Sequence, residues 1–370
     1  MSPQTFVLDI PDASISDLRE RLARTRFPDE PPLEPWSTGT SLAYLRPLLD
    51  YWRDGFDWRA WEAKLNGFRQ FTLPVGGIDL HFIHQPSRKP DAMPLLISHG
   101  WPGSVFEFHK LIPLLTEHFT VVAPSLPGYT LSFRPGQPRF GVVEIATMFA
   151  ELMSALRYTR DGAQGGDWGS YITSVLGHRF PERVTGIHLN LLPVRRDPAM
   201  LPNPNPEEQA YLRQLNHFLK EETGYQWIQG TKPQTLAFAL TDSPAGLAAW
   251  IVEKFRAWTD NAGSPEDAVS RDAMLANIAL YWFTGAIGSS FWPYHARMHG
   301  PWPVPDGETV KVPMGYAEFP KEILSPPRSL AARSYADIRR WTRMPQGGHF
   351  AALEQPEALA REIVAFFQEL

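Results

Sequence analysis

Short apolar runs alternate with helical segments along much of this 370-residue chain, and that alternation limits the possible folds more than any other feature. Residues 95–98, 119–123, 184–191 and 308–312 are predicted to form buried strands, and 338–343 a weaker one. Helices are predicted between them over 105–117, 142–157, 169–179 and 356–369. Strands that alternate with helices in this way favour an α/β fold with a mostly parallel, doubly wound sheet.

One long insertion interrupts this alternation. Residues 196–300 are predicted to be mainly helical and are rich in proline, tryptophan and phenylalanine. An insertion near the carboxyl ends of the strands would cover the crevice where such sheets bind ligands, so we expect a helical lid. The expected divisions are an N-terminal region (1–90), the first part of the core (91–195), the lid (196–300) and the second part of the core (301–370).

The N-terminal region is expected to wrap around the rest of the chain. Its first helix is predicted to begin near Ser14, because Ser14 and Asp17 have the spacing of a capping box. Two more short helices are expected over 41–50 and 58–66, and a hairpin over 71–75 and 78–84. The prolines between residues 28 and 35 favour an extended segment. The region is expected either to clamp the lid or to form a homodimer interface.

Composition and charge exclude several classes of function. The chain contains no cysteine, which excludes disulfide bonds, thiolate metal sites and cysteine nucleophiles. Its formal net charge is −5 and it has no basic stripe, so we expect no nucleic-acid partner. No apolar stretch reaches the roughly 18 residues of a membrane-spanning helix. The N-terminus lacks the pattern of a secretory signal, so we expect a cytoplasmic protein with no membrane partner.

The most informative motif is Gly165-Gly166-Asp167-Trp168-Gly169-Ser170, which precedes a predicted helix. A nucleophile held in a sharp turn between strand and helix needs small neighbours, because a Cβ atom there would clash. The spacing matches the nucleophile elbow of α/β-hydrolases, with Asp167 in place of serine. An ordinary Gly-Asp turn is the alternative, since the preceding residues 160–164 are polar for a central strand.

Two further motifs fit the same fold. Residues 99–104 (HGWPGS) follow a predicted strand, and the loop at that place supplies a backbone N–H to an oxyanion hole. His349, in Gly347-Gly348-His349-Phe350, lies before the last helix, where the histidine base of the fold belongs. A buried structural histidine is the alternative for His349, and His99 is interpreted as structural.

The acid that would orient this histidine is less clear from the residues alone. A carboxylate in that position holds the imidazole and stabilises its charged form. Glu318, Glu322 and Asp337 all lie within reach by sequence. For each of them a solvated surface charge is the alternative.

An aspartate nucleophile narrows the class of reaction. A carboxylate attacks a saturated carbon and forms an alkyl ester, which a histidine-activated water then hydrolyses. Epoxides and alkyl halides are the two obvious electrophiles. This chemistry requires neither a metal ion nor an organic cofactor.

Together these motifs resemble those of the microsomal type of epoxide hydrolase over nearly the whole chain. The stretch FVLDIPDASISDLRERLARTRFPDE resembles the N-terminal domain of that family. Residues 99–104, 165–170, 224–255 and 347–356 resemble its later motifs. The resemblance implies an α/β-hydrolase fold and the conversion of an apolar epoxide and water to a vicinal diol.

The resemblance also implies roles for single residues. Asp167 matches the nucleophile and His349 the base that activates water. Glu322, 349 − 322 = 27 residues before that histidine, matches the acid, which favours it over Glu318 and Asp337.

Four more residues complete the expected site. Tyr225 and Tyr294 match the two lid tyrosines that bind the epoxide oxygen in that family. Ring opening leaves an alkoxide, which needs hydrogen bonds or a proton from a phenol. Backbone N–H groups of Trp101 and Trp168 are expected to stabilise the tetrahedral oxyanion.

Two other functions are weighed against this one. A haloalkane dehalogenase shares the aspartate elbow and often a tryptophan after it. Trp168 is therefore consistent with either an epoxide hydrolase or a haloalkane dehalogenase. The long N-terminal region and Trp101 after His99-Gly100 do not fit that family. A non-catalytic protein of the same fold that binds a small ligand would have no use for a strained nucleophile.

Overall fold

The computed structural model describes residues 2–197, 199 and 201–370, and a nine-stranded sheet lies at its centre. The strand order is β1-β2-β3-β5-β4-β6-β7-β8-β9. The strands span Gln4–Thr5 (β1), Gln70–Val75 (β2), Ile78–Gln85 (β3), Pro94–Ser98 (β4), Thr120–Pro124 (β5), Asp161–Gly165 (β6), Val184–Leu189 (β7), Met314–Glu318 (β8) and Ile338–Arg343 (β9). The strands from β5 to β9 are parallel, whereas β1, β2 and β3 join at one edge in antiparallel fashion. The predicted mostly parallel sheet is therefore confirmed.

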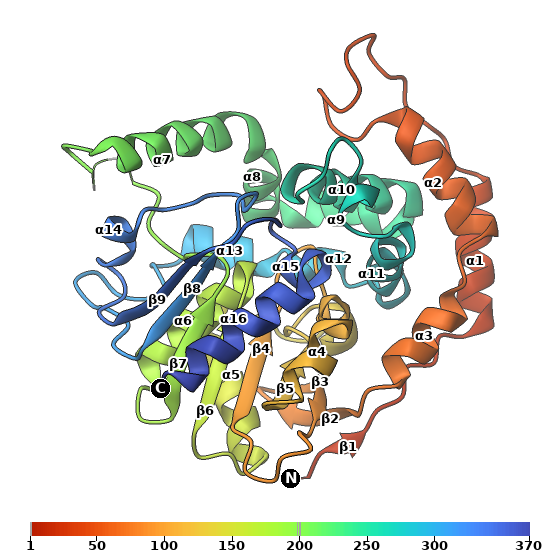
Figure 1. The fold of residues 1–370 in the computed structure, drawn as a ribbon. Coiled ribbons are helices and arrows are strands. Elements are labelled where there is room, and N and C mark those ends of the chain that lie inside the picture. Colours follow the sequence, from red (N-terminus) through yellow and green to blue (C-terminus); the bar gives the residue numbers. More distant parts are fainter. Residues whose placement is uncertain (1, 198, 200) are drawn as a thin grey trace.

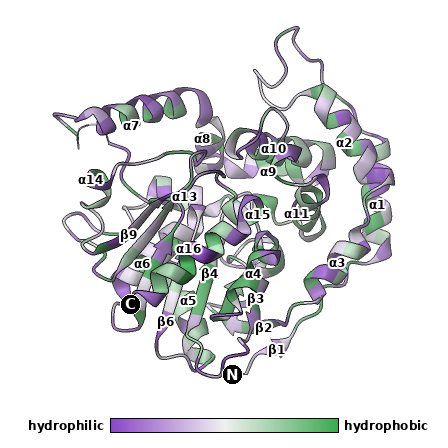
Figure 2. Ribbon diagram, in the orientation of Figure 1, coloured by the Kyte–Doolittle hydropathy of each residue, from purple (hydrophilic) through white to green (hydrophobic). Residues whose placement is uncertain are grey.

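Helices cover both faces of this sheet (Figure 1). Helices α4 (Leu111–Leu115) and α16 (Pro356–Gln368) pack on one face, and α5 (Val142–Ala155) and α6 (Asp167–Arg179) on the other. Successive side chains of a strand point to opposite faces. Leu95 and Ile97 of β4 accordingly join the apolar cluster of α4 and α16, while Leu96 joins that of α5 and α6. Figure 2 shows the hydrophobic character of β4 and β5, as expected for strands buried on both faces.

Strand β6 is central although its sequence is polar. Asp161 forms an ion pair with Arg183 at 3.3 Å, and Gln164 Nε2 donates to Asn190 Oδ1 at 2.8 Å. A Cβ atom on Gly162 would lie 2.6 Å from the ring of Phe367, so this position requires glycine. Paired polar groups are tolerated in a core. The polarity of this segment thus reflects long-range partners that the local sequence does not show.

The predicted strand over 308–312 is wrong. Within this segment Val310 forms only an isolated bridge with Tyr335, and the sheet strand β8 lies at Met314–Glu318. Val310 and Val312 are buried because they pack against Gly177 of α6. Their alternation with exposed Lys311 therefore reflects an extended segment with one buried face. A central strand is buried on both faces and need not alternate.

Two helix predictions also need correction. The helix expected over 105–117 is broken into a 3-10 turn, η1 (Val105–His109), and the short helix α4. Helix α1 begins at Asp12, with Pro11 at its N-cap and no side-chain cap, so the capping box predicted at Ser14 is wrong. The N–H groups of Ser14 and Ile15 donate to the carbonyl oxygen of Pro11, so Ser14 lies inside the first turn and not at its start.

A block of helices lies between β7 and β8 in the chain, above the carboxyl ends of the parallel strands (Figure 1). Its helices are α7 (Pro206–His217), α8 (Gly224–Thr231), α9 (Pro233–Asp242), α10 (Pro244–Trp258), α11 (Arg271–Thr284), α12 (Ile287–Ser290) and α13 (Trp292–His299). Helices α14 (Arg328–Ala331) and α15 (Ala351–Glu354) follow it. A helical insertion covering the sheet is thus present, and the expected domain boundaries stay predictions. Within the described ranges no single helix is long and apolar enough to cross a membrane. Only α9 and α10 taken together have the required length and composition, and this pair is sharply bent.

The N-terminal helices α1 (Asp12–Ala23), α2 (Leu42–Asp54) and α3 (Trp58–Asn66) run along one edge of the molecule towards this block (Figure 1). Tyr51 Oη lies 2.7 Å from Asp272 Oδ1 at the start of α11, and Tyr44 Oη lies 3.0 Å from Glu266 Oε1. The hydroxyl of Thr40 donates to the carbonyl of Ala249 in α10 at 2.6 Å. These contacts connect the N-terminal region to the lid. The expected homodimer stays a prediction.

The buried Asp161–Arg183 pair predicts a pH-dependent stability defect. Burial raises the pKa of Asp161 to about 6, although Arg183 opposes the rise. Arg183→Met should lower the free energy of unfolding by roughly 3 kcal/mol at pH 8, because a buried carboxylate is left without its partner. The loss should be smaller at pH 5, where the folded state can hold Asp161 protonated. Urea unfolding at both pH values measures this.

The matched control is the double variant Arg183→Met/Asp161→Asn, which carries no buried charge. The free energy of unfolding of the single variant should be lower at pH 8 than at pH 5, whereas that of the double variant should not decrease over this range. An equal loss at both pH values in the single variant would mean that the lost hydrogen bonds of Arg183, and not the charge of Asp161, cause the defect.

Candidate active site

The turn between β6 and α6 holds Asp167 in a strained backbone conformation. Its φ is +47°, in the left-handed region that side chains other than glycine rarely adopt. A Cβ on Gly165 would lie 2.2 Å from the carbonyl oxygen of Gly169. A Cβ on Gly169 would lie 2.0 Å from the carbonyl oxygen of Ser98 in β4. The motif is therefore a tight elbow packed against the sheet and not an ordinary turn.

The structure brings Asp167, His349 and Glu322 together. His349 Nδ1 lies 2.6 Å from Glu322 Oε1, and His349 Nε2 lies 3.5 Å from Asp167 Oδ2. Glu322 comes from the loop after β8, and His349 from the loop between β9 and α15. Both residues are buried. The imidazole is thus held between two carboxylates that come from distant parts of the sequence.

The other two candidate acids lie elsewhere. Glu318 accepts from the indole N–H of Trp341 at 2.9 Å and pairs with Arg343. Asp337 pairs with Arg339 at 3.0 Å. Glu322 is the candidate that contacts the imidazole, as the family resemblance implied.

The environment of His349 favours its charged form. Burial by itself would lower the pKa of the imidazole, because a charge is costly in a poorly solvated interior. The charges and hydrogen bonds of Glu322 and Asp167 outweigh that effect and raise the pKa of His349 well above its ordinary value. Neutralising either carboxylate would lower the pKa of the imidazole and increase the fraction of the ring that is unprotonated at neutral pH.

One backbone donor already points at Asp167. The N–H of Trp101 donates to Asp167 Oδ1 at 2.7 Å. The N–H of Trp168 has no hydrogen-bond partner in the part of the chain that the structure describes. Trp101 therefore stands where the expected oxyanion donor belongs, and the Trp168 N–H is free to act as a second one.

His99 has the contacts of a structural residue. Its Nε2 accepts from the N–H of Leu126 at 3.1 Å, and its Nδ1 lies 3.1 Å from the carbonyl oxygen of Gly100. Burial lowers the pKa of His99 to about 4, so the ring is neutral and can accept. Its interpretation as structural fits these contacts.

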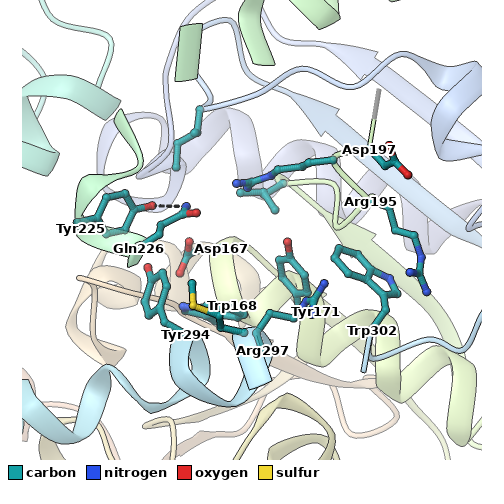
Figure 3. Close-up of a pocket in the computed structure, with 14 residues that line it drawn as sticks. Asp167, Trp168, Tyr171, Arg195, Asp197, Tyr225, Gln226, Tyr294, Arg297 and Trp302 are labelled. Carbon is teal, nitrogen blue, oxygen red and sulfur yellow. Dashed lines mark hydrogen bonds between the residues drawn. The ribbon is translucent and has the colours of Figure 1, made fainter. Parts of the chain in front are cut away.

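The two predicted tyrosines lie next to each other beside Asp167 (Figure 3). Tyr225 comes from α8 and Tyr294 from α13, and their ring centroids are 5.7 Å apart. Trp101 stacks on Tyr225, and Trp168 meets Tyr294 edge to face. Burial raises the pKa of both phenols, so each keeps its proton at neutral pH. Both can therefore donate a hydrogen bond to an oxygen near Asp167.

A cavity of about 520 Å³ opens over these groups. Beside Asp167 its wall is aromatic and includes Trp168, Tyr225 and Tyr294. Three arginines also line it, namely Arg195, Arg196 and Arg297. Figure 3 shows two of them, Arg195 and Arg297, together with Tyr171 and Trp302. Nothing in the sequence marks these arginines, because there they look like ordinary surface charges. Among the described residues no group of three or more His, Asp or Glu side chains could hold a metal ion.

Comparisons with known proteins point to one family. A family model described as "Epoxide hydrolase N terminus" matches residues 3–108, and one described as "alpha/beta hydrolase fold" matches residues 93–226. Epoxide hydrolase 1 of Oryctolagus cuniculus is 38% identical to this chain, and the match covers 99% of this chain and 88% of that protein. A Stigmatella aurantiaca protein, provisionally named an epoxide hydrolase, is 42% identical over 99% of this chain and 84% of its own length.

Solved structures give the same result. The juvenile hormone epoxide hydrolase of Bombyx mori superposes with a TM-score of 0.89 at 31% identity, covering 100% of this chain and 94% of that one. The epoxide hydrolase of Aspergillus niger gives a TM-score of 0.87 at 31% identity, covering 100% of this chain and 97% of that one.

The position of His349 between two carboxylates predicts a measurable change in its titration. Glu322→Gln should lower the pKa of the imidazole, because one of the negative charges that raise it is removed while the burial stays. Asp167→Asn should lower it for the same reason. An NMR titration of the His349 ring measures both shifts, with Glu318→Gln as the control that leaves the value unchanged. An unchanged pKa in both variants would contradict the electrostatic assignment.

Proposed function

Because this chain has the α/β-hydrolase fold and belongs to the epoxide hydrolase family, whose reaction it catalyses, we propose that it opens its substrate through a covalent ester on Asp167. The observation that carries this proposal is the chain of contacts from Glu322 through His349 to Asp167 at the elbow. An aspartate at the nucleophile position attacks a saturated carbon and yields an alkyl ester. Neither a haloalkane dehalogenase nor a non-catalytic ligand-binding protein is favoured by the comparisons.

In the first step the carboxylate of Asp167 attacks one ring carbon of the bound epoxide. A bond forms between the carboxylate oxygen and that carbon, and the carbon–oxygen bond of the ring breaks. The departing oxygen gains negative charge as this bond breaks. Buried neutral phenols of Tyr225 and Tyr294 can donate hydrogen bonds to it or a proton.

In the second step His349 takes a proton from a water molecule that attacks the carboxyl carbon of Asp167. The Trp101 N–H, already 2.7 Å from a carboxylate oxygen, would stabilise the tetrahedral oxyanion, with the Trp168 N–H as the second donor. Cleavage of the ester frees the second oxygen of the diol, which takes up the proton held by His349. The other proton of the water leaves the carboxyl group of Asp167 and returns to the oxygen, or to the phenol, that was left negatively charged in the first step, so Asp167 is a carboxylate again. Glu322 holds the ring in place and stabilises its charged form during this step.

The residues that line the cavity indicate which parts of a substrate they would contact. We propose that the apolar substituents of the epoxide rest against the aromatic wall formed by Trp168 and Tyr294, next to the nucleophile. Arg195, Arg196 and Arg297 line the same cavity, so an extended substrate would meet positive charge there.

Removal of the base predicts an enzyme that stalls at the ester. In His349→Gln the first step is intact but no group accepts the proton of the attacking water. Incubation with an aryl epoxide should therefore increase the intact mass by the mass of the whole epoxide. Mass spectrometry of the whole protein and of its peptides should place that addition on Asp167.

The control for this experiment is Asp167→Ala/His349→Gln, which should show no added mass. A bromoalkane tested in parallel should give no adduct. If only the bromoalkane reacted, with an adduct lighter than the reagent by HBr, the chemistry would be that of a dehalogenase. No adduct from either reagent would refute an ester on Asp167.

The paired phenols predict a graded loss of activity. Tyr225→Phe and Tyr294→Phe should each lower kcat/KM by roughly 10- to 100-fold, because one hydrogen bond to the developing alkoxide is lost. The double variant should lose nearly all activity. Tyr158→Phe, whose hydroxyl contacts His84 far from the cavity, is the matched control. Single variants that keep full activity would mean that the phenols only pack.

A further inference from the structure

A second and much smaller cavity lies against Asp167. Its volume is about 20 Å³, which suits a single water molecule. Besides Asp167, its polar lining consists of His349, Glu107, Gln164 and Asn190, and the rest of the lining is glycine or apolar. These are polar groups, and a cavity with several polar partners is one that water occupies.

The carboxyl group of Asp167 stands between the two cavities. Among the described residues, Asp167 is the one that lines both. The phenols of Tyr225 and Tyr294 line only the large cavity, and His349 lines only the small one. The epoxide and the base therefore approach the carboxylate from different sides. Water in the small cavity would reach the ester without passing the substrate.

Glu107 is the ionisable group in this cavity that the mechanism described above does not use. It belongs to η1, and its carboxyl group makes no hydrogen bond to another group in the described part of the chain. A Cβ on Gly103 would lie 2.1 Å from Glu107 Oε2, so the glycine leaves the space that this carboxyl group fills. Glu107 is half-buried, and a carboxyl group without a partner in such a place is costly unless something in the cavity binds it.

The surroundings of Glu107 favour the neutral form of its carboxyl group. Burial raises the pKa of its carboxyl group to about 8, with His349 lowering it and Asp167 raising it further. A neutral carboxyl group keeps a carbonyl oxygen that accepts hydrogen bonds. Oε1 of Gln164, buried and without a partner among the described residues, is a second acceptor on the same wall.

The attacking water must satisfy three conditions at once. It gives one proton to His349, turns a lone pair towards the carboxyl carbon of Asp167, and has a second O–H that needs an acceptor. We propose that the small cavity holds this water and that Glu107 fixes its orientation by accepting the second O–H. This inference rests on the ester proposed at Asp167. The bond changes are those of the second step, and Glu107 neither gains nor loses a proton.

Two substitutions separate this role from a structural one. Glu107→Leu removes the acceptor, whereas Glu107→Gln keeps a carbonyl oxygen in nearly the same place and imitates the neutral acid. Under single-turnover conditions with an aryl epoxide, the ester should form at a similar rate in both variants and in the wild type. Ester hydrolysis should slow by roughly 10- to 100-fold in the leucine variant and by no more than about threefold in the glutamine variant.

Steady-state kinetics supply a second readout. When ester hydrolysis becomes slower, the ester accumulates, so kcat and KM of Glu107→Leu should fall together while kcat/KM changes little. Partial unfolding would instead lower kcat and leave KM unchanged. Glu117→Gln, at an exposed site after α4, is the control for the substitution itself. If the leucine variant does not fold, Glu107→Met provides the same loss of an acceptor with an unbranched side chain.

The outcomes are distinct. Ester hydrolysis at the wild-type rate in the leucine or methionine variant would overturn the role of Glu107. If the glutamine variant hydrolyses the ester as slowly as the leucine variant, Glu107 does not act as a neutral acceptor. Its role would then require a group that can ionise. Absence of any ester, including in His349→Gln, would refute the proposed ester and this inference with it. An ester that forms normally but is not affected by Glu107 would refute only the inference.

Discussion

The close packing of the elbow against the neighbouring strand is the constraint on which the rest of the site depends. Gly165 and Gly169 let two backbone segments approach so closely that even a methyl group would not fit. This contact holds Asp167 at a φ of +47° and fixes the direction of its carboxylate. Strain of this kind persists only when the surrounding structure enforces it. Here the parallel pairing of β4 with β6 does so.

Two features follow from the position of that carboxylate. His349 and Glu322 arrive on loops after β9 and β8, at the same edge of the sheet, so a buried imidazole comes to lie between two acids. The lid then brings two phenols from α8 and α13 to the opposite side. The carboxylate thus has a base on one side and proton donors on the other. A reaction in which that carboxylate attacks first and is itself attacked afterwards requires both.

The lid is held in place by more than its own packing. Hydroxyl groups of Tyr44, Tyr51 and Thr40 in the N-terminal region bond to it, while β2 and β3 extend the sheet at the far edge. The N-terminal region therefore connects the edge of the sheet with the cover of the cavity.

The sequence by itself determined the fold class and indicated the elbow and the histidine. Each of these depends on local patterns, such as flanking glycines, apolar runs and position before a final helix. The two lid tyrosines were indicated only by the resemblance to the microsomal type of epoxide hydrolase. Three matters were decided only by the tertiary structure. The strand expected over 308–312 lies at 314–318, because a strand buried on both faces carries no alternation to recognise. The polar strand β6 is stable because Arg183 and Asn190 reach it from elsewhere. Glu107 faces the nucleophile because Gly103 leaves it room, and a carboxyl group within a short helical segment gives no local sign of the cavity it will line. Local patterns fix local conformation, but burial and partners arise only when distant segments meet.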